Sequence, residues 1–194
     1  MSRRLSLLLA PLVVLALNAG CASSVSPALE VGSTKVGNDD FLDEVEEWAG
    51  NEGAVDKASL ADQPEGSLPH QLVAAILFQR IDLELHRIEF ERLDLEITDE
   101  ARQATAAGIE SQVQGALEGF SESFAESYVD DEVRRDAVRA ALAEDYPVWR
   151  EEALRTTAIE VNPRYGSWDA EQGMVVPPEG PTDPGADSPL ELGS

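Results

Sequence analysis

The residues that could carry acid–base or metal chemistry are few in histidine and many in carboxylate. The 194-residue chain has two histidines and 38 Asp and Glu residues. His86 follows Asp82 by four positions and precedes Glu89 by three, which on a helix brings two carboxylates near one imidazole. A metal site would need more ligands. We therefore expect His86 to be a surface histidine with a raised pKa, and His70 to be a polar residue of a helix's first turn.

No motif of a known enzyme class is present. Glycosidase-type catalysis needs two carboxylates at a set separation, one with a perturbed pKa, whereas a solvated acidic face explains so many acids more simply. The serines have no GxSxG context, and neither GxxxxGK[ST] nor GxGxxG occurs. A net charge of −24 argues against nucleic acid as a partner. We predict no catalytic residue, metal, cofactor, nucleotide or nucleic acid.

The single cysteine, Cys21, lies at the end of a predicted export signal. Two arginines precede an apolar run over residues 5–17, which is too short to span a bilayer as a helix. The sequence Ala-Gly-Cys that follows is typical of the end of a lipobox, although Asn18 stands where an aliphatic residue is usual. We predict a signal peptide over residues 1–20, lipidation of Cys21 and a tether over residues 21–27. The alternative is a secreted protein with an unmodified thiol.

Hydrophobic periodicity predicts a mainly α fold with a few short strands. Asn38 is expected to cap a helix that ends near Gly50, and a long helix is expected over residues 67–95. Leu83 and Phe90 lie off the main apolar stripe of that long helix. A second buried face of the helix is therefore an alternative. Further helices are predicted over residues 98–128 and 130–144, and Pro147 opens the last one.

Short strand candidates lie at both ends of this region. Residues 29–36 read as a hairpin around a glycine turn, and residues 159–161 and 174–176 are short extended pieces. We hypothesise that the first pairs with 159–161 and joins the chain ends. Residues 52–66 are expected to form a loop, and residues 170–194, rich in acids, proline and glycine, a disordered tail.

Two aromatic motifs are candidate functional or structural sites. Phe120, Phe124 and Tyr128 recur at helical spacing in a polar segment, which favours a core stripe or, alternatively, a client-binding surface rimmed by glutamates. The second motif is expected to be a structural turn that fixes the chain after the last helix, with Arg164 pairing with a carboxylate of the first helix. Its residues are Asn162, Pro163, Arg164, Tyr165, Gly166 and Trp168.

The order of these features resembles the N-terminal chaperone domain of SurA- and PrsA-type extracytoplasmic foldases, in the lipoprotein form common in actinobacteria. The resemblance covers residues 28–169 and rests on NDDFLDEVEEWAGN, the long aliphatic helix, ITDEAR and VNPRYGSWD. It implies an ATP-independent protein that binds unfolded or extended segments of secreted proteins. The short stretch after Asp169 leaves no room for the parvulin domain that many members carry, so prolyl isomerase activity is not expected.

The partners expected from this resemblance are therefore unfolded or extended secreted proteins, together with the membrane through the lipid anchor. The expected location is the extracytoplasmic side of the cell membrane. The alternative function is a structural or scaffold lipoprotein that binds one folded partner.

Overall fold

The computed structural model describes residues 26–51, 67–68, 70–112, 115–178 and 190–191. The predictions for the signal peptide, for Cys21, for the 52–66 loop and for most of the tail lie outside these residues. Within them the chain is mainly helical with a few short antiparallel strands, which confirms the predicted fold class.

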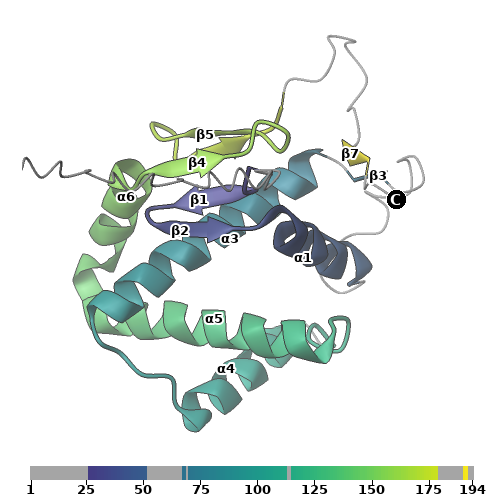
Figure 1. The fold of residues 1–194 in the computed structure, drawn as a ribbon. Coiled ribbons are helices and arrows are strands. Elements are labelled where there is room, and N and C mark those ends of the chain that lie inside the picture. Colours follow the sequence, from purple (N-terminus) through teal and green to yellow (C-terminus); the bar gives the residue numbers. More distant parts are fainter. Residues whose placement is uncertain (1–25, 52–66, 69, 113–114, 179–189, 192–194) are drawn as a thin grey trace, which may run out of the picture.

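Five α-helices make up most of the described chain (Figure 1). They are α1 (Asn38–Gly50), α3 (His70–Arg92), α4 (Asp99–Gln112), α5 (Glu122–Leu142) and α6 (Tyr146–Thr156), and a 3-10 turn (Ala143–Asp145) joins the last two. The strands are β1 (Leu29–Val31), β2 (Thr34–Val36), β3 (Ser67–Leu68), β4 (Ile159–Val161), β5 (Ser167–Asp169), β6 (Met174–Val176) and β7 (Leu190–Glu191).

A three-stranded antiparallel sheet joins the two ends of the domain. Strand β1 lies between β2 and β4, so that Leu29 is opposite Val36 on one side and Val161 on the other. Gly32 makes the β1–β2 turn with φ of 59°, a conformation that favours glycine. The hypothesised pairing of residues 29–36 with 159–161 is therefore confirmed. Residues 174–176 also form a strand, β6, which pairs with β5.

The turn after β4 ties the chain entering the domain to the chain leaving it. The Asn162 side-chain amide donates to the carbonyl oxygens of Ser26 and Pro27, at 3.4 and 3.3 Å, and its carbonyl oxygen accepts the Arg164 N–H at 3.0 Å. Gly166 has φ of 142°, and a Cβ there would lie 2.4 Å from the Val176 carbonyl oxygen. Only glycine fits, because both the conformation and the space exclude a side chain.

Tyr165 anchors the same turn in the core. Its side chain is buried, its ring lies edge-on to Phe41 at a centroid distance of 5.0 Å, and its hydroxyl donates to Asn38 Oδ1 at 2.9 Å. The Arg164 guanidinium lies 5.7 Å from the centre of the Tyr165 ring, while Trp168 packs half-buried against the core. The predicted structural turn thus connects β4 to the start of α1.

Removing this hydroxyl should have a measurable and modest effect. Tyr165→Phe leaves the Asn38 side chain without its partner, and we expect the free energy of unfolding to fall by about 1 kcal/mol. Tyr128→Phe is the matched control, since no hydrogen bond to that hydroxyl is formed within the described residues. Urea unfolding of both variants measures the difference, and equal losses of stability would contradict the proposed role of this hydrogen bond.

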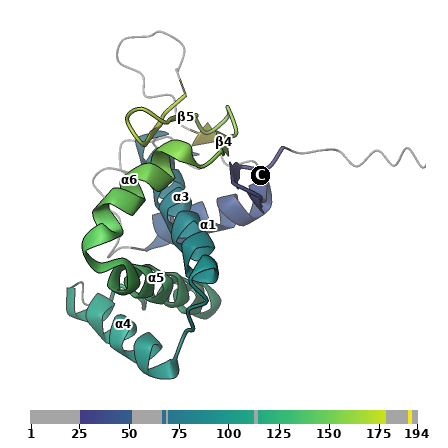
Figure 2. The ribbon, with the colours of Figure 1, turned by 90° about the vertical axis from the view of Figure 1, so that its left-hand side faces the viewer.

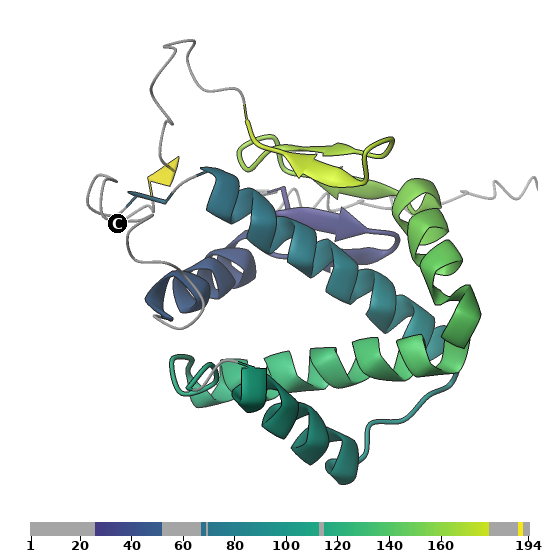
Figure 3. The ribbon, with the colours of Figure 1, turned by 180° about the vertical axis from the view of Figure 1, so that it is seen from behind.

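Helix α3 runs through the middle of the molecule and contacts the strands β1 and β6 as well as α5 and α6 (Figure 3). Val73, Leu77 and Ile81 belong to the apolar core that α3 shares with the sheet and α1. Leu83 and Phe90 are also buried, so the second covered face exists. Helix α4 buries none of its residues and packs against α5 as an outer layer (Figure 2).

The prediction of a single helix over residues 98–128 was wrong, because a turn divides this region into two helices. Helix α4 ends at Gln112, Gly115 has φ of 76°, and α5 begins at Glu122 with the Ser121 hydroxyl accepting the Phe124 N–H as an N-cap. The predicted 130–144 helix is therefore the second half of α5.

Two other boundaries also differ from the expectation. Gly37 rather than Asn38 occupies the N-cap position of α1, and the Asn38 side chain accepts the Tyr165 hydroxyl instead. Strand β3, which pairs with β7, lies at residues expected to begin the long helix. Strand β7 in turn lies in the tail expected to be disordered.

Candidate binding groove between α1 and α5

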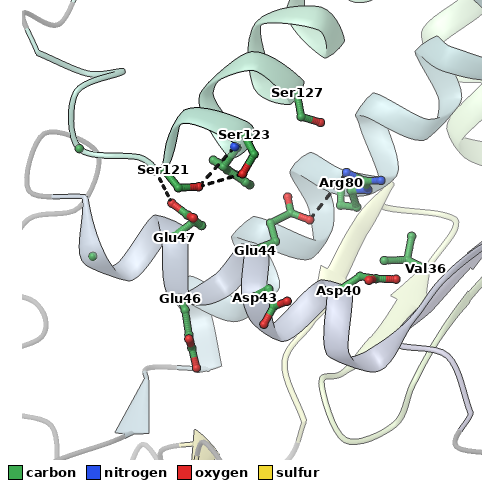
Figure 4. Close-up of a pocket in the computed structure, with 13 residues that line it drawn as sticks. Val36, Asp40, Asp43, Glu44, Glu46, Glu47, Arg80, Ser121, Ser123 and Ser127 are labelled. Atoms are coloured by element: carbon green, nitrogen blue, oxygen red, sulfur yellow. Dashed lines mark hydrogen bonds and ion pairs between the residues drawn. The ribbon is translucent and has the colours of Figure 1, made fainter.

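Helix α1 presents one apolar and one acidic face. Phe41 and Val45 are buried, and they fix α1 against the core. The remaining face carries the acids that border a cavity of about 630 Å³ between α1 and the first turns of α5 (Figure 4). The cavity is lined by Val36, Asp40, Asp43, Glu44, Glu46, Glu47, Gly50, Arg80, Gly119, Ser121, Ser123, Phe124 and Ser127. We call it the α1–α5 groove.

The turn before α5 is held against the end of α1. Asn51 is 1% exposed and its amide donates to the Ala116 carbonyl oxygen at 2.7 Å. The Ser121 N–H donates to the Glu47 carboxylate at 2.9 Å. A Cβ on Gly119 would lie 2.5 Å from the Asn51 side chain, so this close approach requires glycine. These contacts fix the width of the groove at this end.

The three predicted client-binding aromatics come together with Trp48 of α1. Ring centroids of Phe120, Phe124 and Tyr128 lie 5.0, 6.2 and 5.5 Å from that of Trp48, in edge-to-face arrangements. All four side chains are half-buried. They therefore pack on one another and still leave apolar surface exposed, and Phe124 also lines the groove. Client binding by these residues stays a prediction.

Glu44 is the buried carboxylate of the groove. It is 8% exposed, and Figure 4 shows its side chain pointing between α1 and α5 toward Arg80. The nearest guanidinium nitrogen, Arg80 Nη1, is 3.8 Å from Glu44 Oε2. Burial raises the pKa of Glu44 to about 7, although the Arg80 charge opposes this. Nothing in the sequence distinguishes this site, because Glu44 is one acid among many on α1.

Arg80 is shared among three buried or half-buried carboxylates. It binds Glu84 at 2.8 Å, whereas Glu44 and Asp131 are at 3.8 and 3.9 Å. The other two carboxylates have further close cations, since Arg87 binds Glu84 at 2.8 Å and Arg134 binds Asp131 at 2.6 Å. Glu44 is the member of this cluster for which no ion pair shorter than 3.8 Å is formed within the described residues.

The expected surface position of His86 was wrong. His86 is 0% exposed and faces α6, where its ring centroid lies 5.1 Å from that of Trp149. Nδ1 donates to the Asp82 carbonyl oxygen at 2.6 Å, which leaves Nε2 to accept the Tyr146 hydroxyl at 3.0 Å. Burial lowers the pKa of His86, so the ring is neutral at neutral pH. Ile88, two residues further along the same helix, is 36% exposed.

Asp82 joins α3 to both α5 and α6 through ion pairs. Its carboxylate lies 2.7 Å from Arg150 of α6 and 3.4 Å from Arg135 of α5. Arg135 also binds Glu132 at 2.7 Å. Ion pairs therefore contribute to the contacts of α3 with α5 and α6, in addition to the buried apolar side chains of these helices.

Among the residues that the structure describes, no group of three or more His, Cys, Asp or Glu side chains could hold a metal ion. No helix in the same residues is long and apolar enough to cross a membrane. His70 begins α3 and is half-buried, as expected of a first-turn residue.

No family model, curated protein or solved structure matches the chain. The resemblance to the SurA and PrsA family therefore rests on the residue motifs alone.

Proposed function

We propose that this protein is a lipid-anchored, extracytoplasmic chaperone-like protein that binds unfolded or extended segments of secreted proteins. It acts without ATP and without prolyl isomerase activity. The observation that carries the proposal is the α1–α5 groove, in which an aromatic side chain, Phe124, lies among carboxylates and serine hydroxyls. A cavity of about 630 Å³ falls in the size range of ligand sites, ~300–1,000 Å³.

The composition of the groove matches the needs of a protein that binds many unfolded segments. The partly exposed Phe124 ring offers apolar contact that does not depend on a particular sequence. The acids around them keep the surface soluble and attract positively charged segments, because complementary charge raises the rate and specificity of association. The resemblance to SurA-type domains supports the same function.

Cross-linking can locate the bound segment. A photo-reactive amino acid replaces Ser123 in the groove or, as the matched control, Glu100, which is exposed on α4. We expect a purified, chemically unfolded basic protein to cross-link at position 123 several-fold more than at position 100. The same protein in its folded form should cross-link weakly at both. Equal yields at both positions would contradict the proposed site, and capture of one folded partner would favour the scaffold alternative.

The membrane anchor is tested separately. We expect radiolabelled palmitate to be incorporated into the wild-type protein and not into Cys21→Ala, because a thioether-linked diacylglycerol needs the cysteine thiol. A Ser24→Ala variant, which changes the same tether, serves as the control and should be labelled like the wild type. Labelling of the Cys21→Ala variant to the wild-type level would remove the anchor from the proposal.

A further inference from the structure

The Glu44 carboxylate at the floor of the α1–α5 groove has the weakest ion pairing of the three carboxylates around Arg80. The cluster around Arg80 places Glu44, Glu84 and Asp131 near one guanidinium, and the two closest ion pairs of the cluster serve Glu84 and Asp131. The Glu44 side chain is only 9% exposed, so most of it is shielded from water, and the groove that it lines gives access to the rest.

The groups next to Glu44 compensate its charge only in part. Arg80 Nε is buried and has no hydrogen-bond partner within the described residues. The Trp48 indole lies beside Glu44 and favours its charged form, but more weakly than burial disfavours it. A carboxylate buried with such weak compensation destabilises a fold, and groups of this kind are enriched where a protein binds a ligand.

We propose that the Glu44 carboxylate receives the lysine or arginine side chain of the bound segment, and that Glu44 thereby selects basic segments. This inference rests on the proposed function, because it names the chemistry of the same groove. The cavity lies directly beside Glu44, and the four other acids that line it, Asp40, Asp43, Glu46 and Glu47, extend the negative wall along α1. A long basic side chain can place its aliphatic stem against Phe124 while its charge reaches Glu44.

Two synthetic peptides test this selection. One is an unstructured ten-residue peptide with a central lysine between two aromatic residues, and the other carries norleucine in place of the lysine. Fluorescence anisotropy measures the Kd of each. We expect the wild-type protein to bind the lysine peptide on the order of tenfold more tightly than the norleucine peptide, because a desolvated charge pair adds that much.

The Glu44→Gln variant should lose this preference and bind the norleucine peptide as the wild-type protein does. Asp39→Asn removes one charge from the same helix at an exposed position outside the groove, and it should keep the preference. Equal affinity of the wild-type protein for both peptides, or an unchanged preference in Glu44→Gln, would overturn the inference while the proposed function stands. Absence of binding by either peptide would overturn both.

Discussion

Replacing Asp82 by alanine is expected to lower the free energy of unfolding by about 3 kcal/mol. Asp82 is 5% exposed and contacts Arg150 and Arg135, which belong to two different helices. Its loss leaves these guanidinium groups without their shared counter-charge at the contact of α3 with α5 and α6. The expected cost lies at the low end for buried ion pairs, because Arg150 is 35% exposed and can be rehydrated.

A surface pair provides the control for this prediction. Asp136 binds Arg139 at 3.2 Å, and both side chains are more than half exposed. Asp136→Ala should therefore change stability by less than about 1 kcal/mol. Chemical denaturation of the two variants at pH 7 and low salt compares them directly. A similar small loss for Asp82→Ala would show that the buried ion pairs do not hold α5 in place.

Replacing Glu44 by glutamine should stabilise the domain at pH 8, in contrast to the loss of stability expected for Asp82→Ala. Burial raises the pKa of Glu44 from 4.5 to about 7, so between these values the folded protein holds a proton that the unfolded chain has released. Stability contributed by this group therefore rises as the pH falls from about 7 to 4.5. At pH 8 the buried charge of Glu44 lowers the free energy of unfolding by roughly 3 kcal/mol, because each unit of the pKa shift corresponds to ~1.4 kcal/mol. Glutamine carries no charge and therefore removes most of this loss.

The pH profile separates this effect from an ordinary change in packing. We expect Glu44→Gln to be about 2–3 kcal/mol more stable than the wild type at pH 8 and nearly equal to it at pH 4.5. Burial also raises the pKa of Asp131 and Glu132, so some pH dependence of the same sign remains in both proteins. Glu46→Gln, at an exposed position of α1, is the control and should follow the wild type. A constant difference across the pH range would contradict a buried, charged Glu44.

The sequence predicted those elements that local patterns determine. Gly32 between two extended pieces predicted the hairpin, and the aliphatic stripe predicted the long α3. The short strands at the two ends of the domain were correctly expected to pair, because the outer edge of a lone hairpin leaves backbone hydrogen-bonding groups without partners.

The errors arose where tertiary contacts decide the outcome. His86 looked exposed because its i−4 and i+3 neighbours are acidic, although Leu83 and Phe90 mark the face on which it is buried. The turn before α5 follows from contacts with Asn51 and Glu47, which are far away in sequence. Glu44 could not be distinguished from the exposed acids beside it, since its raised pKa comes from burial under α5 and α3.

The capacity to keep an unfolded protein soluble is the central claim, and light scattering tests it most directly. A denatured, aggregation-prone basic protein is diluted into buffer with increasing amounts of the purified protein. We expect aggregation to be suppressed at a few-fold molar excess without ATP, and Phe124→Ala to suppress it much less. Val148→Ala, which shortens a 68% exposed side chain on α6, should act like the wild type. Undiminished aggregation at several-fold excess of the wild-type protein would contradict the account.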